Sequence, residues 1–203
     1  MRGIYAVVNE GGRDPVAVAR AALHAGVRIV QYRAKGGVVP ETAIALRRAT
    51  LECGALCIMN DDADAAARYD FDGVHVGPDD RGFTDIAGLR EILGARLIGV
   101  SCGTVDEAIA AEAGGADYLG VGAVYPTATK PDAGEPIGIA GLRRIADATA
   151  LPVAAIGGIG LAQLPDVRAT GVAMAAVVSA IAGARDPRAA AEALVFAWNE
   201  GAI

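Results

Sequence analysis

Three polar side chains alternate along one short segment of the chain. Gln31, Arg33 and Lys35 follow the apolar residues of "AGVRIV". In an extended chain every second residue points to the same side, so we expect these three side chains to share one face. An amide, a guanidinium and an ammonium group together suit a phosphate or diphosphate. For this segment taken alone, a solvated strand end is the better explanation of the pattern.

A second group of residues supplies carboxylates. Asn60 and Asp61 follow another apolar run, and the pair Asp79 and Asp80 follows "GVHVGP". Oxygen ligands without convergent His or Cys favour Mg²⁺, which one or two carboxylates hold while substrate phosphates fill its other positions. A network of salt bridges with the nearby cations is the alternative interpretation.

Further polar groups follow the later apolar runs. Ser101 ends one of them, and Lys130 lies in the loop "YPTATKPDAGEP". The segments "AIGGIG" and "VVSAI" then offer glycines and main-chain N–H groups, which form the usual phosphate-binding corner of a barrel enzyme. His75 lies inside an apolar run, where a structural and a supporting role are both open.

The elements that must position these groups are eight short apolar runs separated by amphipathic, Ala-rich segments. Strands apolar on both faces are typical of parallel sheets covered by helices. Eight such units in 203 residues predict an α/β fold, a single (β/α)8 TIM barrel spanning residues 1–203. An open doubly wound sheet is disfavoured because "GVGAV" and "GGIGLA" lack the third glycine of the dinucleotide motif. The expected strands are residues 3–8, 28–34, 56–61, 73–76, 97–102, 118–125, 152–158 and 175–181.

One expected helix follows Thr84, and it illustrates how the helices should cover the sheet. Ile86, Leu89, Ile92 and Leu93 recur at helical spacing, so we expect all four to face the strands.

Composition narrows the partners and the location. The net charge of −6 argues against nucleic acid or an anionic membrane surface as the partner. No apolar stretch reaches membrane-spanning length, and the first residues carry too short an apolar run for a signal peptide. The three cysteines show no metal-binding spacing, so we expect reduced thiols in a cytoplasmic protein.

These motifs together resemble the thiamine phosphate synthase family almost end to end. The matching segments, in the order and spacing of that family, are "QYRAK", "NDDADAA", "DGVHVGPDD", "IGVSCGT", "ADYLGVGAVYPTATK", "AIGGI" and "VVSAI". The resemblance implies a Mg²⁺-dependent transferase. It would join a hydroxymethylpyrimidine diphosphate to a thiazole monophosphate, giving thiamine phosphate and pyrophosphate. A homodimer is expected by the same analogy.

The resemblance also implies roles for individual residues. Contacts with the pyrimidine diphosphate are expected from Gln31, Tyr32, Arg33, Ala34, Lys35, Asn60, Ser101 and Lys130, and contacts with the thiazole phosphate from Thr127, Ala128, Thr129, Gly158, Val178 and Ser179. Arg33, Lys35, Ser101 and Lys130 are the expected catalytic residues. Asp61 and Asp80 are the expected Mg²⁺ ligands, with Asp79 the alternative to Asp80 because Pro78 departs from the family's pattern. The side chain of Tyr32 should face away from the pocket.

Three other functions compete with the synthase. The related thiazole tautomerase typically has a catalytic His where this chain has Ala123. A phosphate-binding epimerase or isomerase could use Asp61 and Asp80 as an acid–base pair, but the three cations would then lack a purpose. A catalytically silent protein that binds thiamine precursors is the third alternative, although the expected metal and cation residues are all present.

Overall fold

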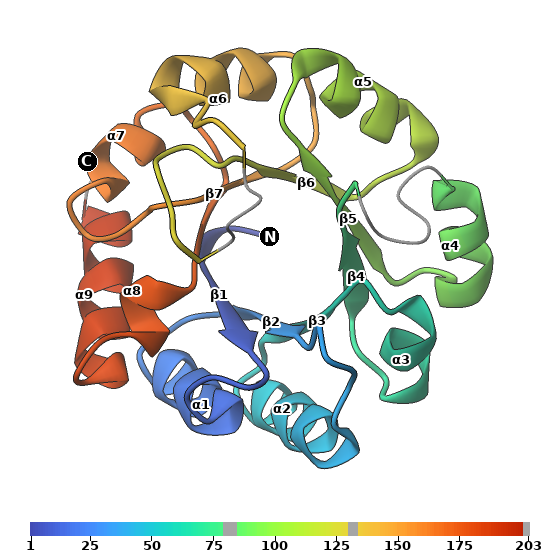
Figure 1. Cartoon of the computed structure of the whole chain (residues 1–203), viewed down its shortest axis with the longest axis vertical. Helices are drawn as coiled ribbons and strands as arrows, with labels where there is room; N and C mark the ends of the chain where they lie inside the picture. The colour runs from blue at the N-terminus through green and yellow to red at the C-terminus, as the bar shows by residue number, and fades with distance from the viewer. Residues whose placement is uncertain (79–84, 130–133, 201–203) are drawn as a thin grey trace.

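The fold is built on a closed barrel of eight parallel strands (Figure 1). It comes from a computed structural model that describes residues 1–78, 85–129 and 134–200. Each strand pairs with its neighbours in the sequence, and the pairing of Gly3 with Met174 closes the ring between β1 and β8. The predicted TIM barrel is confirmed. The strands are β1 Gly3–Asn9, β2 Ile29–Arg33, β3 Leu56–Asn60, β4 Gly73–Val76, β5 Leu97–Cys102, β6 Tyr118–Val121, β7 Val153–Ile156 and β8 Met174–Val177.

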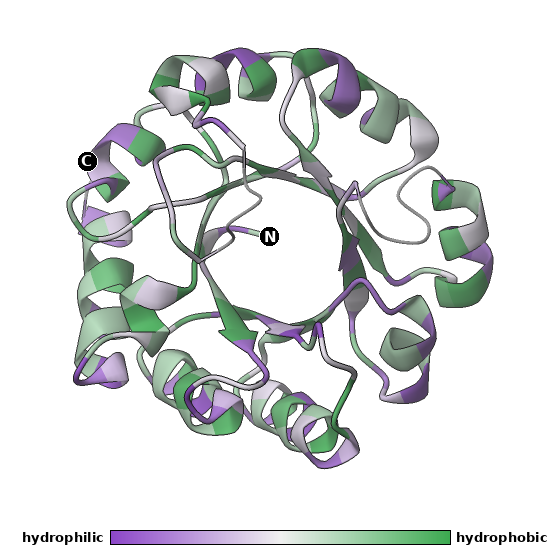
Figure 2. Ribbon diagram, viewed as in Figure 1, coloured by the Kyte–Doolittle hydropathy of each residue, from purple (hydrophilic) through white to green (hydrophobic). Residues whose placement is uncertain are grey.

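Helices form a ring around the barrel, and apolar and polar residues are interspersed along each of them (Figures 1 and 2). Side chains start several helices: Asp14 accepts from the N–H groups of Val16 and Ala17, and Thr104 forms a capping box with Glu107. None of the described helices is both long and apolar enough to cross a membrane. The helices are α1 Pro15–His24, α2 Pro40–Glu52, α3 Ala63–Arg68, α4 Ile86–Leu93, α5 Val105–Gly114, α6 Gly138–Asp147, α7 Leu164–Arg168, α8 Ser179–Ala182 and α9 Pro187–Glu200.

Alternation along the strands divides the buried side chains into two cores. One set packs between the strands and the helices, and it includes Tyr32, Leu46 and Leu142. The other set fills the barrel interior, and it includes Tyr5, Tyr118, Met174 and their neighbours. A side chain on a strand therefore either supports the helices or points toward the barrel axis.

Three details of the sequence prediction are wrong. Residues 175–181 were expected to form one strand, but β8 ends at Val177 and residues 179–181 belong to the helix α8. Residues 118–125 were expected to form one strand, but β6 ends at Val121 because the chain leaves the sheet there and the N–H of Val124 bonds instead to the carbonyl of Ile156. Ile92 was expected to face the sheet with Ile86, but it is 45% exposed. Its position in α4 lies past the edge of the buried stripe, which Leu93 completes.

Candidate active site

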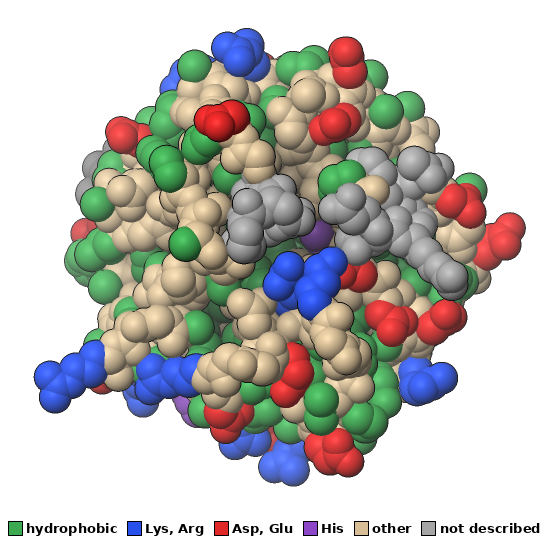
Figure 3. All heavy atoms as spheres, viewed as in Figure 1, with side chains coloured by type: hydrophobic (Ala, Val, Ile, Leu, Met, Phe, Trp, Pro, Cys, Tyr) green, Lys and Arg blue, Asp and Glu red, His purple; other side chains and the backbone are tan. Residues whose placement is uncertain are grey.

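A cavity of about 380 Å³ opens at the carboxyl ends of the strands, and all eight strands contribute to its wall. Figure 3 shows Lys and Arg atoms gathered at the centre of this face, with a red carboxylate group beside them. Substrate sites in barrel enzymes lie at this end because the strands aim their last side chains into one space. The basic group is local, since the whole chain has a net charge of −6.

The first wall of the cavity comes from β2 and β3. Gln31, Arg33 and Lys35 all line it, as their alternation predicts. Asn60 and Asp61 line it from the end of β3, and the Nζ of Lys35 lies 2.6 Å from the Oδ2 of Asp61. The cations and the carboxylate thus meet at the cavity mouth, as both the ligand-binding and the salt-bridge interpretation required.

Asp61 is placed by an uncommon backbone conformation. Its φ of 67° is in the left-handed region, and its N–H donates to the carbonyl of His75 on the neighbouring strand. Among the described residues no three His, Cys, Asp or Glu side chains converge as a ready metal cage. Mg²⁺ does not need one, because it takes one or two carboxylates and completes its shell with water and phosphate. The oxygen donors Asp61 and Asn60 therefore fit Mg²⁺. Asp79, Asp80 and Lys130 lie outside the described residues.

A second wall comes from the segments after β6, β7 and β8, and it includes Thr127, Thr129, Gly158, Val178 and Ser179. The backbone there is closely packed. Gly158 has a φ of +64°, and a Cβ at this position would lie 2.5 Å from the carbonyl oxygen of Pro126. Only glycine allows both that conformation and that approach. The short helix α8 begins at Ser179 without a side-chain cap, so its first N–H groups face no partner from a capping side chain.

Three predicted residues lie away from the described cavity wall: Tyr32, Ala34 and Ala128 are not among its lining residues. Tyr32 is fully buried between the sheet and the helices, and its hydroxyl donates to a carboxyl oxygen of Glu10. This orientation follows from alternation, since Gln31 and Arg33 on either side of it face the cavity. Contacts of these three residues with a substrate stay predictions.

Sequence reasoning missed a row of polar side chains in the barrel interior. Tyr5 and Tyr118 bond to each other through their hydroxyls, and they connect Gln31 on one side with His75 and Ser101 on the other. A tyrosine within an apolar run signals core packing, so only the barrel geometry shows this connection. Asn9, at the end of β1, also lines the cavity, and among the described residues its buried Oδ1 has no hydrogen-bond partner.

The cysteine in the described cavity wall is not an activated thiol. Cys102 lines the wall, but burial raises the pKa of its thiol to about 12. The thiol therefore stays protonated near neutral pH, and it is a poor nucleophile. All three cysteines are free, as predicted.

The fold and this cavity define a (β/α)8-barrel enzyme with a polar, cationic site for small molecules. The sequence profile described as thiamine monophosphate synthase matches residues 4–181. The chain belongs to this family, and it is an enzyme of the transferase class that acts in thiamine biosynthesis, as the sequence predicted.

Individual relatives agree with the family profile. The chain is 41% identical to a thiamine-phosphate synthase from Caldivirga maquilingensis, over 98% of each chain. It is 48% identical to one from Archaeoglobus fulgidus, over 92% of this chain and 88% of the other. Among solved structures it is similar to the thiamine phosphate pyrophosphorylase of Pyrococcus furiosus, with a TM-score of 0.90, 37% identity, and coverage of 99% of this chain and 97% of the other.

Proposed function

We propose that this cavity binds a hydroxymethylpyrimidine diphosphate and a thiazole monophosphate together, and joins them to thiamine phosphate. The observation that carries the proposal is the presence of two kinds of anion-binding wall in one cavity. Arg33 and Lys35 present side-chain charge from β2 and the segment after it, whereas Gly158 and Ser179 present main-chain groups after β7 and β8. Two phosphorylated substrates can be held by these two walls at once.

In this proposal the first wall receives the diphosphate. Arg33 offers a fork of N–H donors and Lys35 a movable point charge, while Asn60, Gln31 and Ser101 supply uncharged contacts. The remaining predicted residues keep the roles that the family resemblance implies: Tyr32, Ala34 and Lys130 with the pyrimidine diphosphate, and Thr127, Ala128, Thr129, Gly158, Val178 and Ser179 with the thiazole phosphate.

The reaction begins when the C–O bond to the diphosphate breaks and its electron pair leaves with pyrophosphate. The positive charge left on the carbon is delocalised into the pyrimidine ring, and the thiazole nitrogen then attacks that carbon. Negative charge grows on the leaving group, so Arg33, Lys35 and Lys130 stabilise the transition state more than the substrate. Mg²⁺ held by Asp61 and Asp80 would add positive charge beside the same oxygens.

The ion pair between Lys35 and Asp61 prepares this wall for its ligands. Each charge balances the other at 2.6 Å, and the Lys35 side chain is 48% exposed. A long, exposed lysine can turn toward an incoming phosphate at little cost. The carboxylate of Asp61 would then be available as a Mg²⁺ ligand.

Two of the competing functions fit this cavity less well. Ala123 lines the cavity where the tautomerase typically has histidine, and a methyl group cannot transfer a proton. An epimerase that used Asp61 as a base would leave Arg33 and Lys35, which line the same cavity, without a purpose. We infer no second function from this cavity.

The test is formation of thiamine phosphate and pyrophosphate by purified protein given both substrates, with and without Mg²⁺. We expect product only when Mg²⁺ is present, and a loss of product in Asp80→Ala but not in the matched variant Asp79→Ala. The reverse pattern would move the metal ligand to Asp79. Binding of both substrates without any product would contradict the proposal and favour the silent binding protein.

A single catalytic domain over residues 1–203, a cytoplasmic location and a homodimer stay predictions from the sequence.

A further inference from the structure

A continuous row of hydrogen bonds crosses the barrel interior at the floor of the cavity. The Nε2 of Gln31 donates to the hydroxyl of Tyr5 at 2.8 Å, and the hydroxyls of Tyr5 and Tyr118 are 3.0 Å apart. Tyr118 Oη lies 3.2 Å from Nδ1 of His75, and Nε2 of His75 lies 3.0 Å from Oγ of Ser101. Gln31, Tyr5, His75 and Ser101 of this row line the cavity, and Tyr118 is not among its described lining residues.

We propose that His75 is a positioning residue, and that the row fixes the hydroxyl of Ser101 as a hydrogen-bond donor into the cavity. This inference rests on the proposed function, which assigns Ser101 to the pyrimidine diphosphate. It adds roles for His75, Tyr118 and Tyr5 that the family resemblance did not supply.

The direction of the row follows from counting protons. The amide nitrogen of Gln31 can only donate, so Tyr5 accepts from it and directs its own single proton to Tyr118. Tyr118 then directs its proton to Nδ1 of His75. A neutral imidazole that accepts at Nδ1 carries its proton at Nε2, and it donates that proton to Ser101. The proton of Ser101 is left for an acceptor in the cavity.

The opposite direction leaves a buried proton without an acceptor. If Ser101 donated to His75, then Tyr118 would donate to Tyr5, whose oxygen would accept twice. The proton of Tyr5 would then have no acceptor among the described residues, and Tyr5 is only 2% exposed. A buried donor without a partner is unfavourable, so the first direction is preferred. Burial also raises the pKa of Tyr5 and Tyr118, which keeps both phenols protonated and able to donate.

Two glycines make the space for this row. A Cβ at Gly99 would lie 2.1 Å from Cζ of Tyr118 and 2.5 Å from Nδ1 of His75. A Cβ at Gly120 would lie 2.7 Å from Cε1 of His75. Both glycines occupy strand positions that face the barrel interior, so the missing side chains are what allow the imidazole and phenol rings to lie 5.4 Å apart.

The direct test is the tautomer of His75, measured by ¹⁵N NMR on protein with labelled histidine. The chain has two histidines, so a His24→Gln variant assigns the signals. We expect His75 to be neutral with its proton on Nε2, and we expect Tyr118→Phe to change its signals. A proton on Nδ1, or a doubly protonated ring near neutral pH, would overturn the proposal. This readout does not depend on activity, so it remains decisive even if the proposed function fails.

The kinetic test is a double-mutant cycle. We expect Ser101→Ala and His75→Leu each to lower kcat by roughly 10²-fold, with little change in KM for the thiazole phosphate. The double variant should be no slower than the slower single variant, because His75 acts through Ser101. Additive losses would overturn the proposal. His75→Gln, which places an amide N–H near the former Nε2, should recover part of kcat.

Tyr118→Phe breaks the row without altering the described cavity wall, and it should lower kcat by a smaller factor than His75→Leu. Tyr69→Phe, at the end of α3 and outside this row, is the matched control and should keep the activity of the unchanged protein. Full activity in Tyr118→Phe would show that His75 needs no partner at Nδ1, and it would contradict the row.

Discussion

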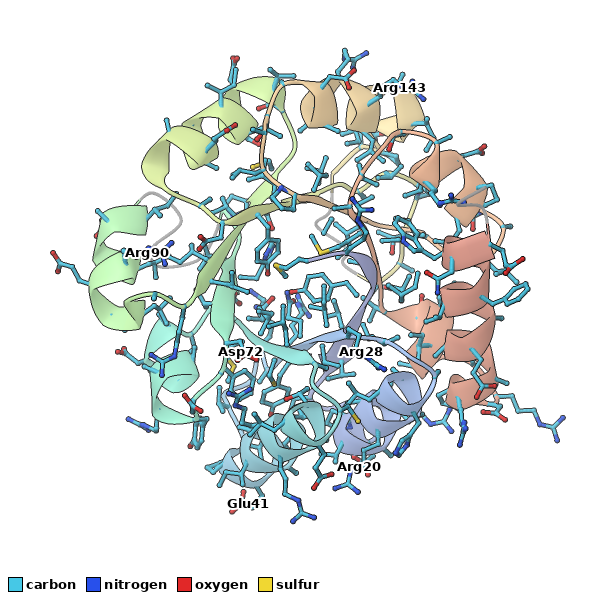
Figure 4. All side chains as sticks on the ribbon, turned by 180° about the vertical axis from the view of Figure 1, so that it is seen from behind. Arg20, Arg28, Glu41, Asp72, Arg90 and Arg143 are labelled. Atoms are coloured by element: carbon cyan, nitrogen blue, oxygen red, sulfur yellow. The ribbon has the colours of Figure 1, made fainter. Side chains whose placement is uncertain are left out.

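The two ends of the barrel both carry paired charges, but they use them differently. At the end seen in Figure 4, Asp72 and Asp117 lie just before β4 and β6, and Asp72 and Arg90 are labelled there. Asp72 Oδ2 accepts from Arg47 Nη1 at 2.9 Å and from the N–H of Cys57 at 2.7 Å. Asp117 repeats this arrangement with Arg90 and with the N–H of Ile98, both at 2.8 Å.

At the opposite end the pair of Lys35 and Asp61 lines a cavity instead. The carboxylates of Asp72 and Asp117 each accept a hydrogen bond from a backbone N–H of a neighbouring strand, so they stabilise the pairing of the strands. The carboxylate of Asp61 faces space in which a ligand can lie. The position of a charged residue at a strand end therefore does not show its role. Its surroundings do: a carboxylate that accepts a hydrogen bond from a strand N–H stabilises the sheet, whereas a carboxylate that faces a cavity can contact a ligand.

The largest expected effect is on activity at the cavity end. Lys35→Gln should lower kcat by about 10²–10³-fold, because a preorganised charge beside the leaving group is lost. Its midpoint of urea unfolding should change little, since exposed ion pairs contribute about 0–1 kcal/mol. Steady-state kinetics and urea titration measure the two effects. An unchanged kcat, or a large loss of stability, would remove the distinction between the two ends.

The second effect is on stability at the other end. Arg47→Gln should lower the free energy of unfolding by about 1–3 kcal/mol, because Asp72 keeps its partly buried position but loses its charged partner. The Arg47 side chain is only 14% exposed, so water replaces it poorly. Activity per folded molecule should be unchanged. A fall in kcat with unchanged stability would mean that the ends are coupled in a way that these contacts do not explain.

Two glycines with positive φ, one at each end of the barrel, provide a third test of the difference between the ends. In Gly158→Ala the added methyl would meet the backbone after β6, whereas at Gly171, just before β8, φ is +86° but nothing lies within 4 Å. Both variants should lose about 1–2 kcal/mol of stability from the left-handed conformation. Gly158→Ala should lose more than Gly171→Ala, because its methyl group would lie 2.5 Å from the carbonyl oxygen of Pro126. Only Gly158→Ala should also raise KM for the thiazole phosphate, by about tenfold or more for a lost phosphate contact of about 1.4 kcal/mol. Equal KM values would argue against the main-chain phosphate wall.

The sequence predicted the barrel and much of the cavity because both depend on local patterns. Apolar runs mark strands, and the alternation of Gln31, Arg33 and Lys35 indicates a shared face. The predicted sixth strand was too long because residues 122–125 are as apolar as a strand. In the structure these residues leave the sheet and pack beside the end of β7. Such a choice depends on contacts between segments, and periodicity carries no information about them.

The row of hydrogen bonds at the floor of the cavity could not be predicted for a related reason. Tyr5 and Tyr118 are 113 positions apart, and only closure of the barrel brings their hydroxyls within 3.0 Å. The signals for it, Gly99 and Gly120, are ordinary strand residues until the rings that fill their space are known.

The smallest expected effect is on the pH dependence of stability. It concerns Asp70, at the end of the barrel where Asp72 and Asp117 lie. Arg47 and Arg96 bond to the exposed carboxyl of Asp70, and these hydrogen bonds hold its pKa below the ordinary value of 3.8. A pKa that is lower in the folded protein adds stability above the unfolded value, and that contribution is lost as pH falls through the folded value. Asp70→Asn keeps the size of the side chain and suits the φ of 54° at this position, so it removes only the charge.

The wild-type protein should therefore be slightly more stable than Asp70→Asn near neutral pH, and the gap should close below about pH 4. Urea midpoints measured from about pH 7 to about pH 3 test this, and added salt should narrow the gap at neutral pH because the pair is exposed. The kcat of the variant should match that of the wild type at every pH where both are folded. A gap that widens toward acid would reverse the sign of the linkage, and it would mean that Asp70 is held in its protonated form by the fold.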